Sequence, residues 1–256
     1  MLWYKAWRES RWRFLSGLVV LMVLACGIIF DYPAVVKLRP LASSVATGDG
    51  FIGRAIREAL EVESDFRGFV WWQWVRQNLT LTWTLFAVLL GSGGLLSDGS
   101  GRGTLFTLSL PASRRRVLGV RVGAALAELL VLAVMPSLLI PLMSPAIGET
   151  YPVRAALVHG TCMFIAGTAF FSLTLLLSTV FSDFWRPLLL ACAVAVVLGS
   201  VEQVLRDASP YGIFRVMSGE VYFRTGRLPW GGLLTSAAVS LALLYGASIN
   251  FAQRDF

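Results

Sequence analysis

The sequence predicts an all-α membrane protein with six transmembrane helices, from its composition and from the spacing of its apolar runs. Of the 256 residues, 56% are hydrophobic and only 14% are charged. A soluble globular domain carries about 25% charged residues, so this chain cannot cover a water-facing surface in the ordinary way. A bilayer core requires roughly 20 mostly apolar residues in a helix. Six stretches meet this length, and we expect them to span: 14–36, 74–96, 117–142, 155–181, 187–205 and 230–251.

The first 13 residues predict an amphipathic helix lying in the membrane interface. Trp3, Trp7 and Phe14 fall on one stripe at helical spacing, while Lys5 and Arg8 lie on the other side. A cleaved signal peptide is the alternative, but no small-residue cleavage pattern follows the first apolar run. We therefore expect a retained first span.

Two longer polar or interrupted segments separate the spans on the predicted outer side. Residues 37–70 contain an apolar series at helical spacing (Ile52, Ala55, Ile56, Ala59 and Leu60), which predicts an amphipathic outer helix. Residues 206–229 are broken by prolines and glycines yet are too apolar for a free loop. Irregular backbone at membrane depth must be buried in protein or face water. We therefore expect this second insert to be re-entrant-like, with short helices dipping toward the membrane.

The basic residues favour an orientation with both termini in the cytoplasm. The chain has 22 Lys and Arg against 15 Asp and Glu. With the N-terminus inside, eleven of the 22 basic residues lie on each side of the membrane, so the total does not decide the orientation. The inner loops are shorter, so their density of basic residues is higher. The positive-inside rule gives most weight to such short loops. We expect a multi-pass protein of the cell (inner) membrane, with its excess charge at the membrane rather than on nucleic acid.

Several kinds of chemistry have no support in the sequence. The only lysines are Lys5 and Lys37, and neither follows a glycine, so the chain has no P-loop of its own. His159 and Cys162 are too few to bind a metal, which takes three or four ligands. An intramembrane serine protease would pair an activated serine with a histidine, but Ser248 lacks the following glycine and His159 precedes it. We expect no catalytic residues and no cofactor or metal bound by this chain.

Three polar residues inside the expected spans are candidates for lining a pathway. Glu128 is the one acid well inside a span, where a carboxyl group is costly and usually faces the bundle interior or a cavity. Thr80 and Thr84 share one side of the second span. The alternatives stay open: the threonines can bond backbone carbonyls, and Glu128 can form an interhelical bond to Arg121 or to a Ser or Thr.

The most informative segment is 97–116, between the second and third spans. It resembles the short cytosolic docking helix in the permease subunit of type-2 ABC transporters, mostly exporters, which has a G-T-L…L-P-[AV]-S-R-R pattern. The specific similarity is confined to residues 95–121, although the layout of spans fits over the whole chain. Many family members carry a glutamate-rich stretch before the Gly-Thr pair, whereas Asp98 is the only acid here. The residues that match the docking pattern are Gly103, Thr104, Leu105, Phe106, Leu108, Leu110, Pro111, Ser113, Arg114, Arg115 and Arg116.

The resemblance implies the partners. Two copies of a separate ABC ATPase subunit would bind ATP and Mg, and a second permease subunit, as homodimer or heterodimer, would complete the pathway within the membrane lipid. The second and fifth spans would line that pathway. The substrate is not implied. The alternative is a membrane sensor or scaffold subunit that does not transport and has no ATPase partner.

Overall fold

The computed structural model describes residues 2–45, 61–92, 114–181, 183–205 and 212–253, and every regular element within them is helical. The all-α prediction is confirmed for this part of the chain. Five helices are long and apolar enough to cross a membrane. They are α1 (Leu2–Val45), α6 (Arg114–Met143), α7 (Val153–Val180), α8 (Trp185–Val204) and α11 (Trp230–Gln253). The chain is therefore a multi-pass membrane protein by the length and composition of its helices.

Helix α1 is longer than the sequence analysis expected. It runs without interruption from Leu2 to Val45, so no break separates an interfacial helix at 1–13 from a span that begins at 14. Its apolar part covers Ser10–Leu38. No proline or glycine occurs before Gly17, which explains why nothing ends the helix near residue 13. The helix also continues through Pro33 and past residue 36, the expected end of the first span, as far as Val45.

The second expected span, 74–96, is not among the five long apolar helices, and its region contains three helical elements in direct succession. Helix α3 (Phe66–Phe69) leads into a ten-residue π-helix, η1 (Val70–Leu79), and then into α4 (Thr80–Gly91). Asp65 caps the start of α3, because its carboxylate oxygen accepts a hydrogen bond from the backbone N–H of Gly68 at 2.8 Å. A π-helix of this length is rare, and shorter π-bulges are frequent at functional sites.

The remaining elements are short. A 3₁₀ turn, η2 (Ser144–Ile147), joins α6 to α7. Helices α9 (Ile213–Ser218) and α10 (Glu220–Thr225) lie within the second predicted insert, and Gly219 separates them with a φ of +62°. The amphipathic outer helix expected around residues 52–60 lies outside the described residues.

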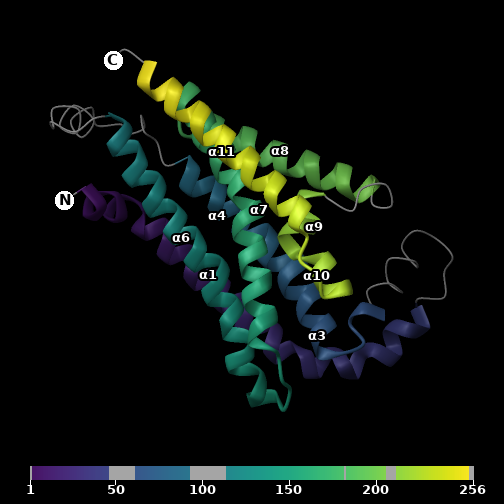
Figure 1. The fold of residues 1–256 in the computed structure, drawn as a ribbon. Helices are drawn as coiled ribbons and strands as arrows, with labels where there is room; N and C mark the ends of the chain where they lie inside the picture. The colour runs from purple at the N-terminus through teal and green to yellow at the C-terminus, as the bar shows by residue number, and fades with distance from the viewer. Residues whose placement is uncertain (1, 46–60, 93–113, 182, 206–211, 254–256) are drawn as a thin grey trace.

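Figure 1 shows how the helices alternate in direction. The start of α1, the end of α4, the start of α6, the end of α7, the start of α8 and the end of α11 lie toward one end of the bundle, which we call the termini end. The end of α8 and helices α3, α9 and α10 lie toward the other, the α10 end (Figure 1).

Helix α7 forms the centre of the bundle, because it packs against α11, α6, α4, α8 and α9. Small residues allow this close approach. A Cβ added at Gly160 would lie 3.1 Å from the backbone oxygen of Ala133 on α6. A Cβ at Gly167 would overlap the ring of Trp83 on α4, which is fully buried and whose Nε1–H donates to the backbone oxygen of Leu129 at 3.0 Å. At these two positions the neighbouring helix approaches α7 closely because α7 carries a glycine there.

We predict that Gly167→Ala destabilises the protein by about 1–3 kcal/mol, because the Trp83 ring is fixed and cannot make room for the methyl group. Gly27→Ala in α1 is the matched control, since nothing lies within 4 Å of its added Cβ. The control should be neutral or more stable, as alanine has the higher helix propensity. The free energy of unfolding in mixed micelles measures both, and an equal effect of the two substitutions would contradict this packing.

Candidate functional site

The predicted docking segment lies mostly outside the described residues. This holds for Gly103, Thr104, Leu105, Phe106, Leu108, Leu110, Pro111 and Ser113. Arg114, Arg115 and Arg116 form the first turn of α6, and the Arg116 side chain is exposed. The two helices that flank the segment, α4 before it and α6 after it, have their adjacent ends at the termini end of the bundle (Figure 1).

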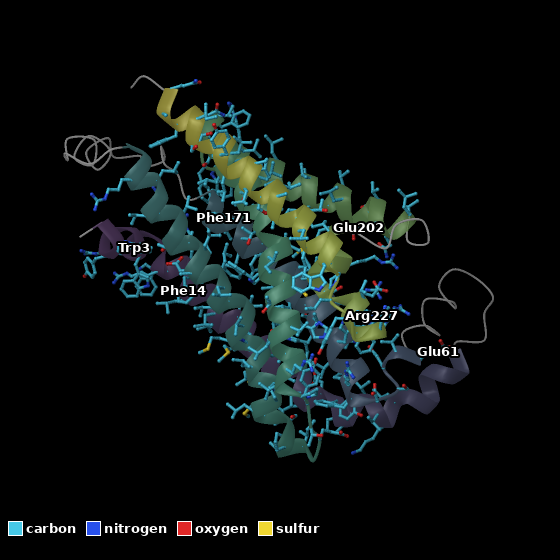
Figure 2. All side chains as sticks on the ribbon, viewed as in Figure 1. Trp3, Phe14, Glu61, Phe171, Glu202 and Arg227 are labelled. Atoms are coloured by element: carbon cyan, nitrogen blue, oxygen red, sulfur yellow. The ribbon has the colours of Figure 1, made fainter. Side chains whose placement is uncertain are left out.

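The predicted interfacial helix lies beside α6. Trp3 lies against Gly123, whose added Cβ would be 3.0 Å from the indole ring, yet Trp3 remains 57% exposed. Phe14 packs against the core, while Trp7 and Arg8 are exposed. Figure 2 shows Trp3 and Phe14 at the same end of the molecule, close to α6. The location of these N-terminal turns in the membrane interface stays a prediction.

Glu128 forms the interhelical bond that the sequence left open. The Ser10 hydroxyl on α1 donates to Oε1 of Glu128 on α6 at 2.5 Å. Glu128 is only 6% exposed, and its Oε2 has no hydrogen-bond partner among the described residues. This carboxyl group therefore joins α1 to α6 within the protomer and retains one unused oxygen.

Arg13 connects three elements at the termini end. Its guanidinium donates to the backbone oxygen of Leu89 at 3.5 Å, and it also lies 5.1 Å from the ring centre of Phe184. Leu89 is in the last turn of α4, and its carbonyl oxygen also accepts from the Ser92 hydroxyl at 3.0 Å. Carbonyl groups at the end of a helix attract cations. Phe184 immediately precedes α8. Arg13 therefore links α1 to the end of α4 and to the start of α8.

The two pathway threonines are buried and bond their own helix. The Thr80 hydroxyl donates to the Val75 backbone oxygen, and the Thr84 hydroxyl donates to the Thr80 backbone oxygen, both at 2.7 Å. They are 4% and 6% exposed. Within one protomer, these hydroxyls satisfy backbone carbonyls rather than facing open space.

A second polar centre, which the sequence analysis did not identify, lies toward the α10 end. The Ser218 backbone oxygen accepts from Nε1–H of Trp71 and from Nδ1 of His159, both at 3.0 Å. A carbonyl oxygen can only accept, so His159 has its proton on Nδ1. All three groups are buried, and Nε2 of His159 has no partner among the described residues. Together they fasten the α9–α10 insert to α7 and to the π-helix.

The glycine after Ser218 makes this junction possible. A Cβ on Gly219 would lie 2.9 Å from Nδ1 of His159, and the positive φ of Gly219 is a conformation that side chains disfavour. The sequence offered two separate signals for this junction: a single histidine inside an apolar run, and a glycine in a polar part of an insert. It did not indicate that the two residues are in contact.

A column of stacked side chains continues from this junction. Phe223 on α10 stacks on Trp71 with ring centres 4.4 Å apart and planes at 5°. The Arg67 guanidinium lies 5.7 Å from the Phe223 ring centre, and the Arg76 guanidinium lies 4.2 Å from that of Trp72. Cation–π attraction holds at these separations. The buried carboxylate of Glu220 receives Nε of Arg215 at 3.1 Å and Nε of Arg224 at 3.0 Å.

Comparison with protein-family models, curated proteins and solved structures gives no match to this chain. The described residues also contain no group of three or more His, Cys, Asp or Glu that could hold a metal ion. Fold and site together define a multi-pass α-helical membrane protein with a polar junction toward each end of its bundle.

If the Ser10–Glu128 bond is structural, Ser10→Ala should lower the free energy of unfolding by about 1–3 kcal/mol, because it leaves a buried carboxyl oxygen without its donor. Glu128→Gln keeps a carbonyl oxygen for Ser10 and removes the charge, so stability should stay equal or rise. Unfolding in mixed micelles distinguishes the two variants. A loss in Glu128→Gln as large as in Ser10→Ala would show that the charge itself stabilises the fold.

The shared acceptor at Ser218 predicts energetic coupling between Trp71 and His159. Trp71→Phe and His159→Leu each leave the carbonyl with one donor, at a cost of about 0.5–1.5 kcal/mol for the lost hydrogen bond plus any lost packing. The double variant leaves the buried carbonyl with neither donor, so its cost should exceed the sum of the single costs. A double-mutant cycle of unfolding free energies measures this excess. Simple additivity would contradict a shared acceptor.

Proposed function

We propose that this chain is the transmembrane permease subunit of an ATP-driven ABC transporter, exporting a substrate through a pathway completed by a second permease subunit. The observation that carries the proposal is the Gly103–Arg116 segment, whose pattern resembles the ATPase-docking helix of type-2 permeases. A separate ATPase subunit, in two copies, supplies ATP hydrolysis and binds ATP and Mg. The protein lies in the cell (inner) membrane with both termini cytoplasmic.

The arrangement of helices supports this assignment. We take the continuous helical run Phe66–Gly91 as the sixth crossing beside the five long helices. An even number of crossings agrees with the start of α1 and the end of α11 lying toward one end of the bundle (Figure 1). The ends of α4 and α6 that flank the docking segment are on that side too (Figure 1). A cytosolic ATPase can then reach the segment from the face that carries the dense short-loop arginines.

Helix α8 supports a dimeric pathway. Only Pro187 and Ala191 are buried among its 20 residues, and one face of the helix packs on α7 while most of its other side chains are exposed within one protomer. A second copy or a related subunit covers part of this exposed surface, and lipid covers the rest. This is the fifth span, which the resemblance places beside the pathway.

The contacts of Arg13 suggest how ATPase closure reaches the spans. Movement of the docking segment acts first on the end of α4 and the start of α6. Arg13 bonds the end of α4 at Leu89 and stacks on Phe184 before α8. The bundles then tilt as rigid bodies between inward-facing and outward-facing states.

Purification from native membranes tests the proposal. A P-loop ATPase should copurify stoichiometrically with the wild-type chain, and changing Arg114, Arg115 and Arg116 to Ala should lose it or uncouple its ATP turnover. The reason is that removal of three cations abolishes charge-assisted contacts to acidic groups on the partner.

The matched control is Arg186→Ala. This arginine lies near the start of α8 at the termini end, outside the docking segment, and pairs with Asp183 at 2.9 Å. It should leave the ATPase bound. Absence of any ATPase from a folded wild-type preparation would overturn the transporter assignment and favour the sensor or scaffold.

A further inference from the structure

We propose that the α10 end of the bundle binds the phosphodiester headgroup of an anionic membrane phospholipid. The site is a patch of five arginines and the aromatic rings that support them, which we call the arginine patch: Arg67, Arg76, Arg215, Arg224 and Arg227. They come from α3, η1, α9, α10 and the turn after α10, so the fold assembles them from two distant parts of the sequence.

The aromatic column positions two of these guanidinium groups. Arg67 lies over Phe223, Phe223 stacks on Trp71, and Arg76 lies over Trp72. Trp71 is fully buried and held by its bond to Ser218, so the column is anchored in the core. The Arg67 side chain is exposed, so the edge N–H groups of its guanidinium can reach a ligand, whereas Nη1 of Arg76 is buried. A guanidinium edge matches two oxygens of a phosphate in a planar, bidentate way.

The acids nearby are already engaged. Both oxygens of Glu220 receive the Nε atoms of Arg215 and Arg224, which fixes these two side chains against α10. Glu63 accepts from Gln73, and Asp65 caps α3. Arg67 and Arg227 are exposed and form no ion pair with any carboxylate of the described residues. Two guanidinium groups of the patch therefore lack an internal counter-charge.

Aromatic residues place the patch at the level of lipid headgroups. Trp72 is half-buried in η1, and Trp230, three residues after Arg227, is 64% exposed at the start of α11. Exposed tryptophans at the ends of membrane helices mark the membrane–water interface. Figure 2 shows Arg227 beside α10, at the opposite end from Trp3.

The distribution of basic residues supports the binding of an anionic lipid at this end. In the expected six-span layout, eleven of the 22 basic residues fall on each side of the membrane, so the side away from the cytoplasm carries eleven of them. The positive-inside rule disfavours that number. An anionic headgroup bound at the patch compensates the positive charge of its arginines. This inference does not depend on an ATPase partner and stands or fails separately from the transport proposal.

Lipid binding to the purified full chain tests it. The protein is titrated with phosphatidylglycerol, and separately with phosphatidylcholine, in neutral mixed micelles, and bound lipids are counted by native mass spectrometry. We expect preferential, salt-sensitive binding of phosphatidylglycerol. Arg67→Gln and Arg227→Gln should each weaken it about fivefold, the effect of removing one basic residue near a lipid surface, and phosphatidylcholine binding should not change.

Three controls make the result specific. Arg67→Lys keeps the charge and should retain most of the affinity, and Arg186→Gln removes an exposed arginine at the other end and should retain all of it. Soluble glycerol phosphate should compete poorly, because it lacks the acyl chains that hold the headgroup at the interface. Wild-type affinity in both glutamine variants, equal binding of the two lipids, or glycerol phosphate binding as tightly as the lipid would each overturn the proposal.

Discussion

The close packing of small residues around α7 is the constraint on which the rest of the structure depends. Lipid tails are as apolar as leucine, so burial from water does not drive membrane helices together, and tight van der Waals contact must do so. Gly160 lets α7 approach the α6 backbone, and Gly167 accepts the buried ring of Trp83 from α4. Gly91 is the reciprocal case, because an added Cβ there would lie 2.8 Å from the Phe171 backbone oxygen on α7. The positions of α4 and α6, and with them the ends that flank the docking segment, follow from these contacts.

Most hydroxyl groups in the bundle bond their own helix, and this determines where polar links between helices occur. Ser172, Thr174 and Ser240 each donate to a carbonyl four residues earlier, so they need no partner elsewhere. Links across helices include an indole of α4 that donates to an α6 carbonyl, a carboxyl on α6 that accepts from a serine of α1, and a carbonyl at the end of α9 that accepts from an indole and an imidazole. The serine–carboxyl bond holds α1 to the bundle, and the bonds to the α9 carbonyl hold the α9–α10 insert.

The sequence was sufficient for the helical class and for the five long apolar helices, because length and apolarity alone determine which segments suit a bilayer. It did not predict that α1 continues past Pro33 as far as Val45, beyond the expected end of the first span at residue 36. A proline removes a helix hydrogen bond and usually ends or kinks the helix. Here Tyr32 packs against Phe66 and Phe69, with ring centres 4.9 Å and 5.1 Å away, and this tertiary contact holds the chain in place next to the proline.

The π-helix and the polar junction at Ser218 were unpredictable for a related reason. The run from Val70 to Leu79 has an ordinary helical pattern in the sequence. In and next to it, side chains of Asn78 and Thr80 donate to carbonyls five residues earlier, and Trp71 reaches across to α9. The Trp71–Ser218 bond joins residues 147 positions apart, whereas periodicity reports only on near neighbours.

The arginines toward the two ends of the bundle differ in how they are grouped. Toward the α10 end, Arg215 and Arg224 share the buried carboxylate of Glu220, and Arg67 and Arg76 rest on aromatic rings. At the termini end, Arg13 lies over Phe184, Arg186 pairs with Asp183, and three successive arginines begin α6. Cations gathered from several elements around one carboxylate and one aromatic column form a shaped surface suited to one small anion, whereas a run of arginines at a helix start can pair with a broad acidic surface. A count of charges treats the two ends alike, and the grouping of the arginines is what separates a candidate lipid site from a candidate protein-docking site.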